Sequence, residues 1–232
     1  MSELGHPRVH WRRTGSTNDR ARELALAGAP HGTLVTTDEQ TAGRGRHGRR
    51  WSAPPASGVL MSIVLRSPPR LLPLIAALAV CDVAGEQARI KWPNDVVVAR
   101  GPRLAKLAGI LAEGRPQEGW AVLGIGLNVA VRLDELPGEL RDTAATMGLE
   151  RDAVEPTLAR LLAALQRRIE QPAQATLRAW RERDGLRGRA IAWATGRGRA
   201  AGVDGDGRLI VVLDDGARTA LQAGEVHLQA VS

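Results

Sequence analysis

The chain has 232 residues, a formal net charge of +7 and 44% hydrophobic residues. This length and apolar fraction suffice for one large domain and one small one, and they argue against a disordered chain. The sequence has a single cysteine, no secretory leader pattern and no run of about 20 apolar residues, which argues against a secreted or membrane-spanning protein and favours the cytoplasm. The arginines are spread along the chain, so the charge alone identifies no partner.

The first predicted elements are a strand at residues 9–13, a helix at about residues 16–29 and a strand at residues 33–37. Three polar side chains at the start of the helix are predicted either to cap it or to present hydrogen-bond donors to a polar ligand. They are Ser16, Thr17 and Asn18.

An arginine- and glycine-rich loop follows within residues 36–51. Its glycines let the backbone turn and approach a ligand, while Arg44 and Arg46 offer planar, permanently charged groups to a carboxylate or phosphate. The pattern is not a dinucleotide fingerprint, because helix-breaking residues follow it and no acidic residue occurs between Glu39 and Asp82. We predict an anion-binding loop; the alternative is a solvated basic tract that contacts nucleic acid.

The middle of the chain alternates apolar runs with turns. Residues 58–66 are predicted to form a buried strand, and residues 71–87 a helix that is apolar on every face. A turn and strand at residues 90–100 and further strands at residues 106–113 and 120–129 are predicted to form one antiparallel sheet with hairpin connections.

Two sites in this segment invite a functional interpretation. Pro93 makes a rigid turn, after which Asn94 and Asp95 either stabilise that turn or offer oxygen atoms to hydrogen bonds or a metal. Lys106 enters an apolar strand, either as a functional cation or as an edge-strand lysine that deters aggregation. The sequence assigns no certain metal ligands.

Two helices are predicted next. Residues 132–146 lead to them as a polar loop that we expect to be mobile. The first helix, residues 152–170, has a clear apolar stripe, and Asp152 is placed to cap it. The second helix, residues 173–184, ends at Gly185.

Beyond Gly188 the pattern changes to short strands separated by turns. Gly-Asp-Gly and Asp-Asp-Gly sequences are strong hairpin signals. Five such strands in about 45 residues predict a small closed barrel. The expected fold is therefore α+β, with a mixed or antiparallel sheet and helices in residues 1–186 and the barrel in residues 187–232.

Composition singles out five residues. The chain has no phenylalanine or tyrosine, and lysine and asparagine are almost absent. Arginine replaces lysine freely on a surface but not where a compact ammonium group is required. The few lysines and asparagines are therefore candidates for function: Lys91, Lys106, Asn18, Asn94 and Asn128.

Five short motifs occur in order between Thr14 and Asn128. They are Gly-Ser-Thr-Asn, Gln-Thr-Ala-Gly-Arg-Gly-Arg-x-Gly-Arg-x-Trp, Lys-Trp-Pro-Asn-Asp, Lys-Leu-Ala-Gly-Ile-Leu and Gly-x-Gly-x-Asn. Together they resemble the motifs of biotin–protein ligases. The resemblance implies an enzyme that makes biotinyl-5′-adenylate from biotin and ATP with Mg²⁺, and then transfers biotin to a lysine of a biotin carboxyl carrier domain. It also implies that the C-terminal barrel is SH3-like.

The resemblance assigns the site residues as well. The biotin-binding positions it implies are Ser16, Thr17, Asn18, Gln40, Gly43, Arg44, Gly45, Arg46 and Lys106. The positions it implies on the ATP or adenylate side are Trp51, Lys91, Asn94, Asp95 and Asn128. Lys106, Arg44 and Arg46 are expected to be catalytic, because fixed cations let a carboxylate and a phosphate approach each other. The loop is expected to order over the ligand and exclude water.

The sequence departs from part of the family. Only 15 residues precede Ser16, too few for the N-terminal helix-turn-helix of the repressor members, so we expect no binding to operator DNA. A free sheet edge would allow a homodimer.

Three alternatives stay open. A lipoate or octanoyl ligase or transferase shares the core fold, but its hallmark lysine and cysteine arrangement is not evident in this sequence. A nucleic-acid-binding module would bind with a steep dependence on salt. A non-catalytic biotin-binding or carrier-docking protein would keep the ligand pocket and form no adenylate.

Overall fold

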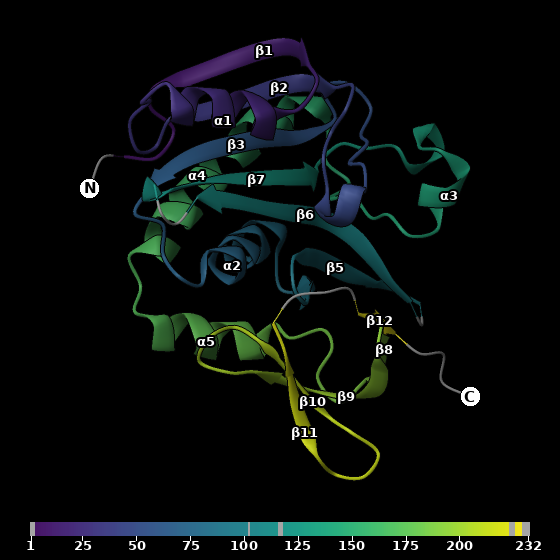
Figure 1. Ribbon diagram of the computed structural model, residues 1–232. Helices are drawn as coiled ribbons and strands as arrows, with labels where there is room; N and C mark the ends of the chain where they lie inside the picture. Colours follow the sequence, from purple (N-terminus) through teal and green to yellow (C-terminus); the bar gives the residue numbers. More distant parts are fainter. Residues whose placement is uncertain (1–2, 102, 116–117, 223–225, 229–232) are drawn as a thin grey trace.

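Two β-sheets form the framework of the computed structural model, which describes residues 3–101, 103–115, 118–222 and 226–228 (Figure 1). In the large sheet the first two strands run parallel and all other neighbours run antiparallel. The predicted mixed sheet is therefore confirmed. In spatial order the large sheet consists of β1 (Arg8–Thr14), β2 (Leu34–Gln40), β3 (Gly58–Arg66), β7 (Trp120–Asn128), β6 (Arg103–Arg115), β5 (Asp95–Arg100) and β4 (Arg89–Lys91).

Helices cover both faces of this sheet. α1 (Thr17–Leu26) lies on one face, and α2 (Leu72–Ala84) and α4 (Val154–Ile169) lie on the other. α5 (Ala173–Glu182) packs against α2. The shorter helical segments are α3 (Gly138–Arg141) and the 3-10 turns η1 (Arg46–Gly48), η3 (Leu133–Glu135) and η4 (Arg151–Ala153). The predicted long helices are confirmed to within a few residues at each end.

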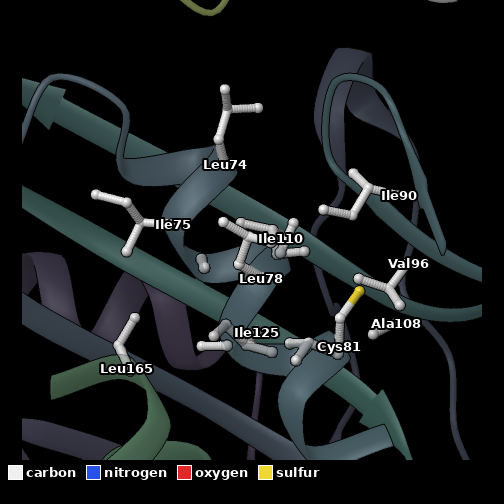
Figure 2. Close-up of a cluster of buried hydrophobic side chains, with 14 of the residues drawn as sticks. Leu74, Ile75, Leu78, Cys81, Ile90, Val96, Ala108, Ile110, Ile125 and Leu165 are labelled. Carbon is white, nitrogen blue, oxygen red and sulfur yellow. The ribbon is translucent and has the colours of Figure 1, made fainter. Parts of the chain in front are cut away.

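Alternate residues along the strands decide which helix packs on which face. Ile63 and Leu123 lie in the main core with α2 and α4, whereas their neighbours Val64 and Val122 pack with α1 in a smaller cluster. This is the two-residue period of a strand with both faces covered. Figure 2 shows the main core, where Leu78 of α2 lies among side chains of the sheet.

The segment before α4 is more regular than expected, and the predicted cap of α4 is wrong. Residues 132–146 include η3 and α3, and the backbone N–H of Lys106 donates to Thr143 O, with N and O 2.7 Å apart; the mobility of this segment stays a prediction. Asp152 does not cap α4, because it lies inside η4 and the N-cap position falls on Ala153, which makes no side-chain cap bond. Ser16 occupies the N-cap position of α1, also without a side-chain cap bond.

The C-terminal strands form a separate antiparallel sheet. In spatial order it consists of β11 (Arg218–Leu221), β10 (Leu209–Val212), β9 (Gly196–Val203), β8 (Ala190–Trp193) and β12 (His227–Leu228). The α+β class and this second sheet are confirmed, but the closed barrel is not, because among the described residues the outer strands β11 and β12 do not pair. β12 is only two residues long and bonds to β8 alone. The 186/187 boundary stays a prediction, and residues 229–232 lie outside the described chain.

The smaller sheet rests on the large one near the Lys-Trp-Pro-Asn-Asp turn. Trp92 Nε1 donates to Gly207 O at 3.0 Å, in the turn between β9 and β10. Gly207 has a φ of +77° and packs against α2, where an added Cβ would lie 3.1 Å from Leu74 and 3.2 Å from Leu71. The C-terminal sheet thus supports the β4–β5 turn and the start of α2. None of the helices in the described ranges has the length and apolar character needed to cross a membrane.

The contact at Gly207 can be tested with two alanine substitutions. Gly207→Ala should lower the free energy of unfolding by about 1–2 kcal/mol for its positive φ, and further for overpacking against α2. Gly216→Ala is the matched control, because Gly216 has a φ of +84° but no neighbour within 4 Å of an added Cβ. Urea unfolding measures both. Equal losses would contradict the docking of this turn on α2.

Candidate functional site

One pocket lies on the α1 side of the large sheet and collects most of the predicted site residues. Its walls come from the start of α1, the end of β2, the glycine-rich loop, the β4–β5 turn, and β6 and β7. Segments far apart in the sequence therefore meet at one place. The predicted residues that line it are Ser16, Thr17, Asn18, Gln40, Arg44, Gly45, Arg46, Trp51, Lys91, Asn94, Asp95 and Lys106.

The floor of the pocket is made of glycines on two neighbouring strands. Gly109 of β6 is paired with Gly126 of β7, and the Trp51 indole lies over both. A Cβ on Gly126 would lie 2.4 Å from Trp51 Cε2, and one on Gly124 only 2.0 Å from Asn18 Oδ1. These glycines belong to two of the sequence motifs but were not among the predicted site residues. The sequence signal for such a floor is glycine at every second position of a strand, because these glycines leave one face of the strand without side chains.

A β-bulge turns Lys106 toward this floor. Val96 of β5 faces Ala108, but the next residue, Val97, faces Lys106, so Leu107 is an extra residue in β6. Both Leu107 and Ala108 lie in the main core although they are consecutive. The extra residue reverses the alternation before it, which puts Lys106 on the pocket face. The apolar strand therefore keeps its core packing and still presents a cation.

Lys106 lies among charged and aromatic groups. Its Nζ is 2.7 Å from Asp95 Oδ1 and 5.6 Å from the centroid of the Trp51 ring. Burial lowers the pKa of Lys91; the negative charge of Asp95 raises it, and the positive charges of Lys106 and Arg49 lower it. The cations at this end of the pocket are therefore close enough to disfavour one another, which an anionic ligand would relieve.

A chain of hydrogen bonds joins the start of α1 to three strands. Gln40 Oε1 accepts from the backbone N–H of Thr17 at 2.8 Å and lies 3.2 Å from its hydroxyl. Ser62 Oγ lies 2.8 Å from Thr17 Oγ1 and 2.6 Å from Asn18 Oδ1. Asn18 Nδ2 in turn donates to Glu113 Oε2 at 2.8 Å. Ser62 and Glu113 were missed by sequence analysis, since each stands in an apolar strand outside the quoted motifs.

Two predicted site residues do not line the pocket. Gly43 closes the base of the loop: its O accepts from Trp51 N–H at 2.9 Å, and a Cβ would lie 2.4 Å from Trp51 O. Asn128 is buried and its Nδ2 donates to Ala145 O at 2.8 Å. Ala145 N–H bonds to Lys106 O, so Asn128 holds the segment that runs beside Lys106.

The charge of the pocket is strongly positive. Asp95 is the one acidic residue among its described lining residues. Such a site favours ligands with several negative charges. No cluster of three or more His, Cys, Asp or Glu residues suited to a metal occurs in the described chain. The cationic lining residues are Arg44, Arg46, Arg49, Arg50, Lys91 and Lys106.

Two family models match the chain. Residues 11–129 match the model described as the Biotin/lipoate A/B protein ligase family. Residues 194–228 match the model described as the Biotin protein ligase C terminal domain. The first match contains the whole of the pocket-forming part of the large sheet, and the second most of the smaller sheet.

Individual proteins are similar over different spans. The chain is 42% identical over 144 residues to the bifunctional ligase/repressor BirA of Bacillus subtilis, which covers 57% of the chain and 43% of BirA. It is 35% identical over 225 residues to the biotin--[acetyl-CoA-carboxylase] ligase of Paracoccus denitrificans, covering 86% and 91%. The solved structure of biotin protein ligase from Aquifex aeolicus in complex with biotin and ATP superposes with a TM-score of 0.77 at 25% identity, covering 97% of the chain and 100% of that protein. The chain thus spans less than half of BirA.

The close contact between Gly124 and Asn18 of α1 can be tested by substitution. Gly124→Ala should lower the free energy of unfolding by about 1–3 kcal/mol, because the new methyl group overlaps Asn18. Gly114→Ala in β6 is the control: its nearest contact would be 3.3 Å, and we expect a change within about 0.5 kcal/mol. Urea unfolding compares the two variants. A Gly124→Ala protein as stable as the control would show that Asn18 is not fixed against β7.

Proposed function

The chain belongs to the biotin/lipoate A/B protein ligase family, and we propose that it activates biotin with ATP and transfers biotin to a lysine of a biotin carboxyl carrier domain. The substrates are taken from the Paracoccus ligase and from the Aquifex protein, whose structure holds biotin and ATP. The observation that carries the proposal is the convergence of Arg46, Lys91 and Lys106 on a pocket with a single carboxylate among its described lining residues.

The first step joins two anions. A carboxylate oxygen of biotin attacks the α-phosphorus of ATP, the bond from that phosphorus to the bridging oxygen breaks, and pyrophosphate leaves with the bonding electrons. The barrier is mainly electrostatic, and fixed cations lower it without any protein nucleophile. Lys106 is aimed at the pocket by the β-bulge, and Arg46 reaches it from the loop, with Nη1 3.5 Å from Asn94 Oδ1.

The second step needs the first product to survive. The mixed anhydride hydrolyses in water. The glycine-rich loop and Trp51, which lies directly against the glycine floor, line the pocket and would limit the access of water. The acceptor lysine then attacks the biotinyl carbonyl carbon, and AMP leaves. The lysine amine must lose a proton, for which the departing phosphate is the acceptor at hand.

Magnesium would enter with the nucleotide. Mg²⁺ uses one or two carboxylates together with phosphate oxygens and retained waters. Asp95 with the amide oxygen of Asn94 offers such a partial donor set, so the residues fit an ion carried by ATP. When bound, the ion would supply charge neutralisation at the phosphates. A homodimer, the cytoplasmic location and the lack of operator binding remain predictions of the sequence.

A cysteine-dependent acyl transferase of the same fold is the main alternative. The attacking species in such an enzyme is a thiolate. Cys81 is fully buried in α2, within the main core shown in Figure 2, and burial raises the pKa of its thiol to about 12. The position of Cys81 therefore disfavours this alternative.

The inertness of Cys81 can be measured. At about pH 8 the native chain should react with the disulfide reagent DTNB about a thousand-fold more slowly than the urea-unfolded chain, because almost no thiolate forms in the core. Cys81→Ala should keep the activity. Fast labelling of the native chain, with activity lost at the same rate, would favour the transferase.

The role of Lys106 is tested by the first half-reaction alone. With biotin, labelled ATP and magnesium but no carrier, the chain should form labelled biotinyl-adenylate, and Lys106→Ala should form it about 100-fold more slowly or worse. Arg103→Ala, an exposed cation at the start of the same strand, is the matched control and should match the wild type. If the folded wild-type chain binds ATP but makes no adenylate, the ligase proposal is wrong, and a non-catalytic biotin-binding protein becomes the better description.

A further inference from the structure

Arg44 is held between two carboxylates. Its Nη1 donates to Asp19 Oδ1 at 2.6 Å and its Nη2 to Glu113 Oε1 at 2.8 Å. The hydrogen bond to Asp19 and the charge of Glu113 both raise the pKa of Arg44. One guanidinium between two carboxylates contributes little net positive charge to the pocket, whereas the ammonium group of Lys106 pairs with the single carboxylate of Asp95.

Glu113 is the member of this group that joins separate parts of the site. Glu113 Oε1 accepts a hydrogen bond from Arg44 of the loop, and Glu113 Oε2 accepts one from Asn18 Nδ2 of α1 at 2.8 Å. Its side chain is 29% exposed, against 47% for Asp19, so solvent screens its bond to Arg44 less. Glu113 therefore connects the loop to both β6 and α1, whereas the shorter bond from Asp19 connects it to α1 alone.

Backbone hydrogen bonds fix the two ends of the glycine-rich loop. Ala42 N–H bonds to Gly15 O at 2.8 Å at one end, and Trp51 N–H bonds to Gly43 O at 2.9 Å at the other. In between, Gly45 N–H bonds back to Arg49 O within the loop itself. Arg44 ties this intervening part to α1 and β6, and Arg46 contacts Asn94 in the β4–β5 turn.

We propose that Glu113, assisted by Asp19, is a positioning residue that acts through Arg44: it holds the glycine-rich loop over the pocket, and it makes Arg44 a structural anchor while Arg46 and Lys106 face the ligand's anions. The part that concerns the ligand rests on the function proposed above. The part that concerns the loop does not, because these contacts are made between residues of the chain itself. The two parts can therefore be tested separately.

Hydrogen–deuterium exchange of residues 42–51 in the ligand-free chain tests the attachment. Glu113→Gln should speed exchange of this segment about five-fold, since the charged hydrogen bond to Arg44 is lost, and Asp19→Asn should speed it less. Glu155→Gln is the matched control, because Glu155 also accepts hydrogen bonds from an arginine, Arg8, far from the loop. It should leave the segment unchanged.

A double-mutant cycle tests the route through Arg44. Arg44→Met should speed exchange as Glu113→Gln does, and the double variant should be no faster than Arg44→Met alone. Unchanged exchange in Glu113→Gln, or additive effects in the double variant, would overturn the proposal.

Kinetics test the ligand-facing part. Glu113→Gln and Arg44→Met should raise KM for biotin several-fold by similar factors, while kcat for adenylate formation falls far less than in Lys106→Ala. A kcat in Arg44→Met as low as that of Lys106→Ala would make Arg44 a catalytic cation and overturn this part. If the wild type made no adenylate, the exchange results would still decide the attachment of the loop, so the two failures are distinguishable.

Discussion

The site depends on one extra residue in a strand. Without the bulge at Leu107, strict alternation would put Lys106 on the same face as Ala108 and Ile110, inside the core under α2. A lysine there would pay a large desolvation cost without a partner. The bulge lets β6 keep apolar packing on both sides of the irregularity and still turn its single lysine to the pocket. The position of the principal cation is thus fixed by strand register.

Around Lys106 the pocket has a floor of glycines, which lack side chains, and a rim of polar groups that bond to one another. Gly109 and Gly126 leave a hollow in an otherwise covered sheet, and Trp51 lies over it. The rim is stiff because its polar groups are bonded to one another from Gln40 through Ser62 to Glu113. Groups that are already oriented lose little freedom when a ligand arrives, which favours stabilisation of charge that develops during the reaction.

Much of this could be predicted from the sequence. The strand at residues 58–66 has the predicted bounds, because its apolar run is bordered by clear breakers, and the scarcity of lysine pointed to Lys106. The bulge could not be predicted, since Leu107 and Ala108 look like any apolar pair. Glu113 and Ser62 were missed because their partners are distant in sequence. Asp152 does not cap α4, because a 3-10 turn at residues 151–153 displaces the start of the helix. Closure of the barrel depends on pairing between the two outer strands, which local hairpin signals do not predict.

The most direct test of the account is the exchange of labelled pyrophosphate into ATP, catalysed by the chain without any carrier protein. If fixed cations join the biotin carboxylate to the α-phosphorus in this pocket, the step is reversible and label should enter ATP only when biotin is present. A folded chain that binds both biotin and ATP, yet exchanges no pyrophosphate, would contradict the claim that this pocket makes the adenylate.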